Sequence, residues 1–197
     1  MKHVRTILAT ALMVTTGLFA AVASGASAGA APGQNTTLTL TIKNCEDCGV
    51  GLVSVMAADY EDLWQSPEKK VKNGEVTFKV PIDRTAGLSI AVSPPWETAV
   101  PYETMVALRY KGYAPGDKVS YSDINDAKKA SGCWAGTTEA ALTLKVVVKK
   151  VTVMGNMGPV NGSIAFAKTT QPYLQPMHPV WDGVLGSQDV FGCGPDA

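Results

Sequence analysis

The amino-acid sequence predicts an all-β protein, an antiparallel β-sandwich of immunoglobulin or prealbumin type with about seven or eight short strands. Three observations lead to this prediction. Apolar and polar residues alternate in several short runs, turn residues separate these runs, and no segment keeps a helical period of 3.6 residues. A closed β-barrel is the alternative architecture.

The first strand is predicted to begin at Thr36. Leu38, Leu40 and Ile42 alternate there with threonines, which is typical of a half-buried strand with β-branched residues on its solvent face. Residues 50–57 are apolar on both sides and predict a second strand.

The next strand contains Val76, Phe78 and Val80, which alternate with polar residues. It follows Asn73-Gly74, the dipeptide that best tolerates the positive φ angles of a two-residue hairpin turn. A tight hairpin is therefore predicted at this dipeptide.

Residues 88–93 alternate again, and Pro94-Pro95 ends that strand because proline has no backbone donor. Residues 105–110 predict a strand that is apolar on both sides, and Ile164 with Phe166 predicts the last one. Ser122 is a candidate cap for one short helical turn.

The longest alternating pattern covers residues 142–148, and its phase then shifts because the next apolar residues are Val151 and Val153. An extra residue in a strand makes a β-bulge. A bulge or a crossing between sheets is therefore predicted at Lys149-Lys150.

The N-terminus is typical of a secretory signal peptide: Lys2 and Arg5 precede an apolar run over residues 7–23, and Ala26-Ser27-Ala28 follows. We expect residues 1–28 to be the signal, with cleavage as late as residue 30, and a secreted, extracellular protein. The expected organisation of the remainder is a flexible lead over 29–35, the sandwich over 36–168, and an irregular Pro/Gly-rich segment over 169–197 that covers the sandwich.

The charge balance gives no reason to expect two partner classes. The 197-residue chain has 17 basic and 17 acidic residues, and loss of the signal leaves a net charge of about −2. Nucleic acids and anionic membranes are bound through clustered positive charge, which this sequence lacks. After the N-terminal run, no segment is apolar for the roughly 20 residues that a membrane span needs.

Four cysteines in an exported chain predict two disulfides. Three connectivities are open, and we favour Cys45 with Cys48 and Cys133 with Cys193, because the second bridge would tie the C-terminal segment to the core.

The Cys-x-x-Cys spacing also fits a thiol oxidoreductase, which needs a helix N-terminus to lower the thiol pKa. Here a strand-like run follows, and Glu46 and Asp47 would raise that pKa. No second cysteine or histidine pair completes a zinc site. A structural bridge is the favoured interpretation.

Loop carboxylates make a secreted hydrolase the alternative function. His178 is the only histidine after the signal, and no Gly-x-Ser-x-Gly elbow accompanies it. The carboxylates that such an enzyme could use form two groups: Asp59, Glu61 and Asp62, and Asp117, Asp123 and Asp126.

A further alternative is an exported Cu(I)-binding protein. Met154 and Met157 place two thioethers in a glycine-rich turn, and Met177-His178 offers two more ligands. Thioethers of this kind select Cu(I). The opposing interpretation is that Met154 fills the edge of the sandwich, and no metal or cofactor is assigned.

Loop aromatics are the candidate ligand-binding residues: Trp96, Tyr102 and Trp134. Tryptophan and tyrosine at one end of a sandwich can hold sugar rings. Trp134 follows Cys133, so packing in the core is favoured for this residue.

Four short motifs are the run from Leu38 to Cys48, Gly74–Pro81, Arg109–Gly112 and Ser131–Gly136. Together they resemble motifs of small exported actinobacterial proteins of uncharacterised function. The resemblance implies an export signal, a β-sandwich and disulfides, and it carries no functional residues.

The sequence thus favours a secreted, non-enzymatic β-sandwich that acts by binding an extracellular ligand, either a component of the cell envelope, a polysaccharide or a protein. No cofactor is predicted.

Overall fold

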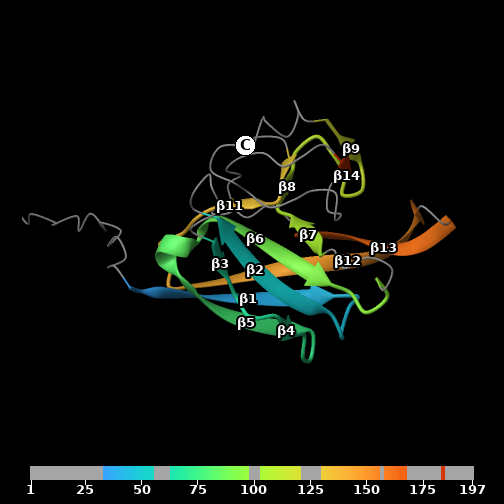
Figure 1. Cartoon of the computed structure of the whole chain (residues 1–197). Helices are drawn as coiled ribbons and strands as arrows, with labels where there is room; N and C mark the ends of the chain where they lie inside the picture. The colour runs from blue at the N-terminus through green and yellow to red at the C-terminus, as the bar shows by residue number, and fades with distance from the viewer. Residues whose placement is uncertain are drawn as a thin grey trace, which may run out of the picture.

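The computed structural model describes residues 33–55, 63–97, 103–120, 130–155, 158–167 and 183–184, and this part of the chain is all-β (Figure 1). A single 3-10 turn, η1 (Ile82–Arg84), is the only helical element among these residues. The strands are β1 (Asn35–Lys43), β2 (Gly49–Val55), β3 (Leu63–Gln65), β4 (Lys69–Lys70), β5 (Glu75–Pro81), β6 (Ala86–Ser93), β7 (Thr104–Ala107), β8 (Arg109–Tyr110), β9 (Lys118–Val119), β10 (Ala130–Ser131), β11 (Cys133–Ala135), β12 (Ala141–Gly155), β13 (Gly158–Ala167) and β14 (Gly183–Val184).

Ten strands form one mixed sheet in the order β3-β2-β6-β7-β13-β12-β1-β5, with β11 added to β6 and β4 added to β2. The prediction of an antiparallel fold is wrong at two places, because β1 pairs with β12, and β7 with β13, in parallel. Alternation in a sequence shows which side chains face inward but not which distant strand lies alongside. The barrel alternative is not found either, because the end strands β3 and β5 do not pair with each other within the described residues.

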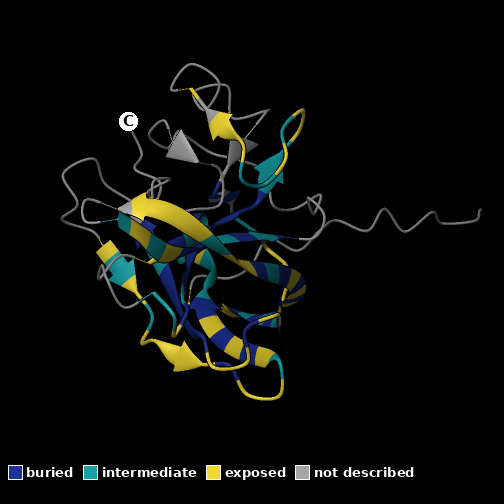
Figure 2. Ribbon diagram, turned by 90° about the vertical axis from the view of Figure 1, so that its right-hand side faces the viewer, coloured by how far each residue is buried: buried dark blue, intermediate teal, exposed yellow. Residues whose placement is uncertain are grey.

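The sheet folds over so that both of its halves contribute to one hydrophobic core. Leu40 on β1 and Phe78 on β5 come from one half, and Leu52 on β2 and Ile90 on β6 come from the other. All belong to one cluster of buried residues, which Figure 2 shows in the interior of the molecule.

The sequence pattern of β1 and β5 is confirmed residue by residue. Both strands alternate between buried apolar residues and more exposed polar ones. The hairpin before β5 is confirmed too: Asn73 and Gly74 have φ angles of 53° and 75°. Lys72 and Glu75 exchange two backbone hydrogen bonds of 2.9 and 3.0 Å across this turn.

In β6 the expected solvent face is absent. Every residue from Gly87 to Val92 is buried, including Ser89 and Ala91, which alternate with the apolar residues. The strand lies between β2 and β7 and also pairs with β11, so it is central in the sheet. Small side chains such as serine and alanine are covered at little cost and do not mark a wet face.

The predicted bulge or crossing at Lys149-Lys150 is wrong. β12 continues through both lysines in unbroken register with β13, from Val148 opposite Ala165 to Val151 opposite Gly162. The phase shift has another cause: β1 stops pairing at Val147, so β12 and β13 continue beyond it as a two-stranded ribbon. In Figure 1 this ribbon extends past the body of the sheet.

Near the end of this ribbon, the described part of the chain leaves the side chains of β12 exposed. Val153 is 40% exposed and Met154 is 82% exposed. Met154 therefore does not fill the edge of the core, as one interpretation of the sequence expected.

Several predictions lie outside the described residues. They are the signal peptide over 1–28, most of the lead over 29–35, the helical turn after Ser122, and the segment 169–197 apart from two residues. Those two residues form β14, which pairs with β9. Among the described residues, no helix has the length and hydrophobicity that crossing a membrane requires.

Candidate functional site

A groove opens at the end of the sheet where β1 finishes and β2 begins. Three connections form its walls: the β1–β2 loop, the hairpin between β4 and β5, and the segment after β6. Its volume is about 580 Å³. The residues that line it are Ile42, Lys43, Asn44, Cys45, Glu46, Asp47, Asn73, Gly74, Pro95 and Trp96. We call it the Trp96 groove.

The disulfide between Cys45 and Cys48 fixes one wall of the Trp96 groove, and this pairing was predicted. Both cysteines are buried, whereas Glu46 and Asp47 between them are exposed. A buried bridge is typical of a structural cystine. It holds the two carboxylates at the rim of the groove.

Trp96 forms the opposite wall, and neighbours on two sides fix its ring. The side chain is half-buried and packs against the core. Its indole Nε1 donates a hydrogen bond of 2.8 Å to Ser163 Oγ on β13. The ammonium of Lys150 lies 5.8 Å from the ring centroid, in the range of a cation–π contact.

The other two candidate aromatics do not join Trp96 in the groove. Trp134 is 1% exposed and belongs to the core, where it pairs with Leu88 across β11 and β6. Its ring is therefore not a surface platform, in agreement with the packing role that the sequence favoured. Tyr102 lies outside the described residues.

The alternative sites fall mostly outside the described residues. Asp117 is described, and its Oδ2 accepts a 2.7 Å hydrogen bond from the backbone of Ala114, as in a polar turn. Within the described ranges no group of three His, Cys, Asp or Glu side chains could hold a metal ion. The candidate residues that lie outside the described ranges are Asp59, Glu61, Asp62, Asp123, Asp126, Met157, Met177, His178 and Cys193. The side chain of Cys133 is not described.

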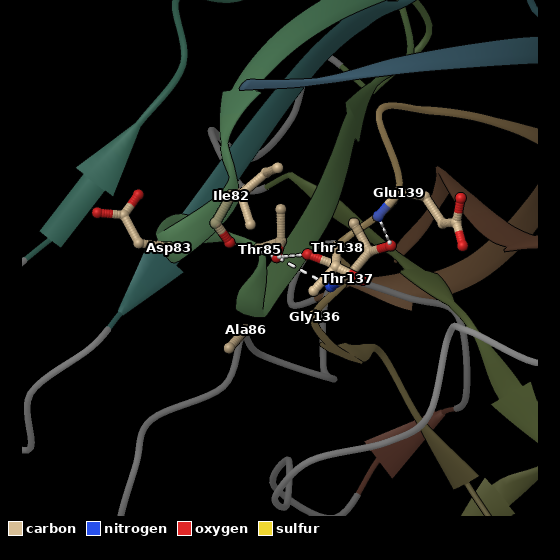
Figure 3. Close-up of a pocket in the computed structure, with 8 residues that line it drawn as sticks. All are labelled: Ile82, Asp83, Thr85, Ala86, Gly136, Thr137, Thr138 and Glu139. Carbon is tan, nitrogen blue, oxygen red and sulfur yellow. Dashed lines mark hydrogen bonds between the residues drawn. The ribbon is translucent and has the colours of Figure 1, made fainter. Parts of the chain in front are cut away.

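A second pocket lies at the other end of the sheet, between η1 and the segment that leads into β12 (Figure 3). Its polar groups bind one another: Thr85 Oγ1 accepts from the backbone of Thr137 at 3.0 Å, and Thr137 Oγ1 accepts from the backbone of Glu139 at 3.0 Å. In Figure 3 the carboxylates of Asp83 and Glu139 point away from each other. The bond between Thr85 and Thr137 joins two distant segments, whereas the bond between Thr137 and Glu139 lies within one loop, so the polar groups of this pocket have a structural role.

Two carboxyl groups that the sequence did not single out have raised pKa values. Burial raises the pKa of Glu97, although hydrogen bonds from Ser163 and Thr104 act in the opposite direction. Burial also raises the pKa of Glu103, and the nearby Glu68 carboxylate raises it further. The Glu68 carboxylate occupies the space that a side chain at Gly49 would fill. No local pattern reveals these carboxylates, because their partners come from distant segments.

Glu103→Gln is expected to flatten the dependence of stability on pH. Because the folded state raises the pKa of Glu103, it holds a proton that the unfolded state has lost, so this residue lowers stability as pH rises above the usual glutamate range. Glu103 is only partly removed from solvent, so the variant's gain in free energy of unfolding at pH 7 should be at most about 0.5 kcal/mol. Urea denaturation at pH 4 and pH 7 measures it, and a variant with the wild-type pH slope would contradict the assignment.

No family model matches the chain, and no curated protein or solved structure shows a significant similarity to it. Its function is therefore argued from the chemistry of the Trp96 groove. The fixed indole provides an apolar surface there, and amide, carboxylate and ammonium side chains surround it. This combination suits a ligand that has apolar faces and a polar edge.

Proposed function

We propose that the protein acts by binding at the Trp96 groove and carries out no chemical turnover. A polysaccharide is the ligand class that the groove supports best, because a pyranose ring stacks on an aromatic face while its hydroxyls bind amides and carboxylates. The observation that carries the proposal is the indole of Trp96, fixed by Ser163 at the wall of a groove with polar loops. A protein ligand from the cell envelope is the other class to test.

The proposal places this activity outside the cell. We propose further that the N-terminus is a signal peptide, that Cys133 and Cys193 form a second disulfide, and that the fold is an immunoglobulin- or prealbumin-like sandwich. The buried Cys45–Cys48 bridge supports an oxidising compartment, where such bonds persist.

Trp96→Ala is expected to abolish retention on the polysaccharide that the wild-type protein binds. Loss of a central aromatic contact costs about 2 kcal/mol, which corresponds to roughly 30-fold weaker binding. The measurement is retention of the mature protein on cellulose, chitin, xylan and purified cell-wall preparations.

Trp64→Ala is the matched control. Trp64 on β3 is also half-buried and packed against the core, but it pairs with Ser54 at the end of β2 farthest from the groove. Both variants are first checked for a wild-type circular dichroism spectrum. Equal retention of the wild type and Trp96→Ala, or no retention of the wild type on any of these materials, would remove the proposal.

A further inference from the structure

A chain of polar contacts continues behind Trp96 into the protein. Ser163, which receives the indole N–H at 2.8 Å, is only 4% exposed. It is also a hydrogen-bond partner of the Glu97 side chain. Thr104 Oγ1 lies 3.2 and 3.1 Å from the two oxygens of the same carboxylate and donates to it. Four side chains from the segment after β6, from β7 and from β13 thus form one network.

The chemistry of these side chains determines which of them donate and which accept each hydrogen bond in the network. An ionised carboxylate can only accept hydrogen bonds, and a serine hydroxyl has one proton to donate. The Ser163 proton must therefore point toward Glu97, which leaves its lone pairs for the indole N–H of Trp96. An indole nitrogen can only donate, so it requires this orientation.

We propose that Glu97 is a positioning residue of the Trp96 groove, which acts through Ser163 to hold the indole ring at the groove wall before a ligand arrives. The effect of Glu97 on ligand affinity rests on the proposed function. The effect of Glu97 on the Trp96 ring in the free protein does not depend on it. A ring that is fixed in advance loses less conformational freedom when a ligand binds.

Lys150 is the one described charged group that lies over the Trp96 ring, and its contact is independent of this network. Lys150→Met therefore serves as a control, because it removes the ammonium and leaves Glu97 and Ser163 in place.

The experiment measures solvent exchange of the Trp96 indole N–H by NMR in the free, full-length protein. The chain has four tryptophans, and the indole signal of Trp96 is assigned by its loss in Trp96→Phe. Glu97→Met keeps the length of the side chain and removes the acceptor, and we expect roughly tenfold faster exchange of this proton. Glu97→Gln keeps an acceptor oxygen and is expected to stay near the wild-type rate, as is Lys150→Met.

Glu97→Ala is measured in parallel in case the methionine variant does not fold, which the other indole signals reveal. Unchanged exchange in the folded Glu97→Met and Glu97→Ala variants would overturn the proposal, and so would equal acceleration in Glu97→Gln and Glu97→Met. The two proposals fail separately, because exchange is measured without a ligand. A protein that binds no polysaccharide but shows the expected exchange rates would keep the positioning role and lose the proposed function.

Discussion

Replacing Val146 by aspartate is expected to unfold the protein at room temperature. Val146 lies in the middle of the sheet, opposite Ile42 on β1 and Ala167 on β13, and its side chain is fully buried. An unpaired carboxylate at such a position costs about 5 kcal/mol, even after partial relaxation. This loss is comparable to the whole stability of many domains.

Val153→Asp on the same strand is the matched control. Val153 is 40% exposed and lies on the ribbon, where β12 pairs with β13 alone among the strands that the structure describes. The substitution should change the free energy of unfolding by less than about 0.5 kcal/mol. Urea denaturation followed by circular dichroism measures both variants. A Val146→Asp protein as stable as the wild type, or a Val153→Asp protein that is unfolded, would contradict the arrangement of β12.

This pair of residues also shows what alternation can and cannot predict. Val146 and Val153 both belong to apolar patterns in the sequence, yet only the first lies in the core. The pattern of β1 and β5 was predictable because one face of each strand packs against the core and the other meets solvent. The hairpin was predictable because only a few dipeptides adopt two positive φ angles.

The remaining features depend on neighbours that a local pattern does not contain. The parallel partner of β1 is β12, about 100 residues later in the chain. The covered outer face of β6 and the ribbon beyond Val147 depend on where other strands begin and stop pairing. Sequence reasoning therefore found the longer strands but missed the short strands β3, β4, β9, β10, β11 and β14, the strand order and the two parallel pairings.

The candidate site was predictable to a similar extent. Trp96 stood out because it follows two prolines at the end of a strand, whereas the acidic pair between Cys45 and Cys48 was considered only as evidence against a reactive thiol. The network behind Trp96 did not stand out, because Ser163 lies 67 residues away in the chain. In the sequence, Glu97 and Glu103 do not differ from other acidic loop residues. Only the tertiary structure shows that burial raises their pKa values.

Trp134→Ala is expected to lower the free energy of unfolding by about 4 kcal/mol, the typical cost of removing a large aromatic side chain from a core. Trp134 is 1% exposed and is the largest of the fully buried side chains among the described residues. It lies on β11, which pairs with β6, so the cavity would open beside a strand in which every residue from Gly87 to Val92 is buried. Thermal and urea denaturation measure the loss.

Trp134→Phe separates packing from ligand binding for this residue. Phenylalanine fills part of the same space, so the loss should be about 1–2 kcal/mol and the protein should remain folded. Because Trp134 contacts the core and does not line the Trp96 groove, this folded variant should bind a retained polysaccharide as tightly as the wild type. Weakened binding with little loss of stability would instead assign Trp134 to the ligand and contradict its place in the core.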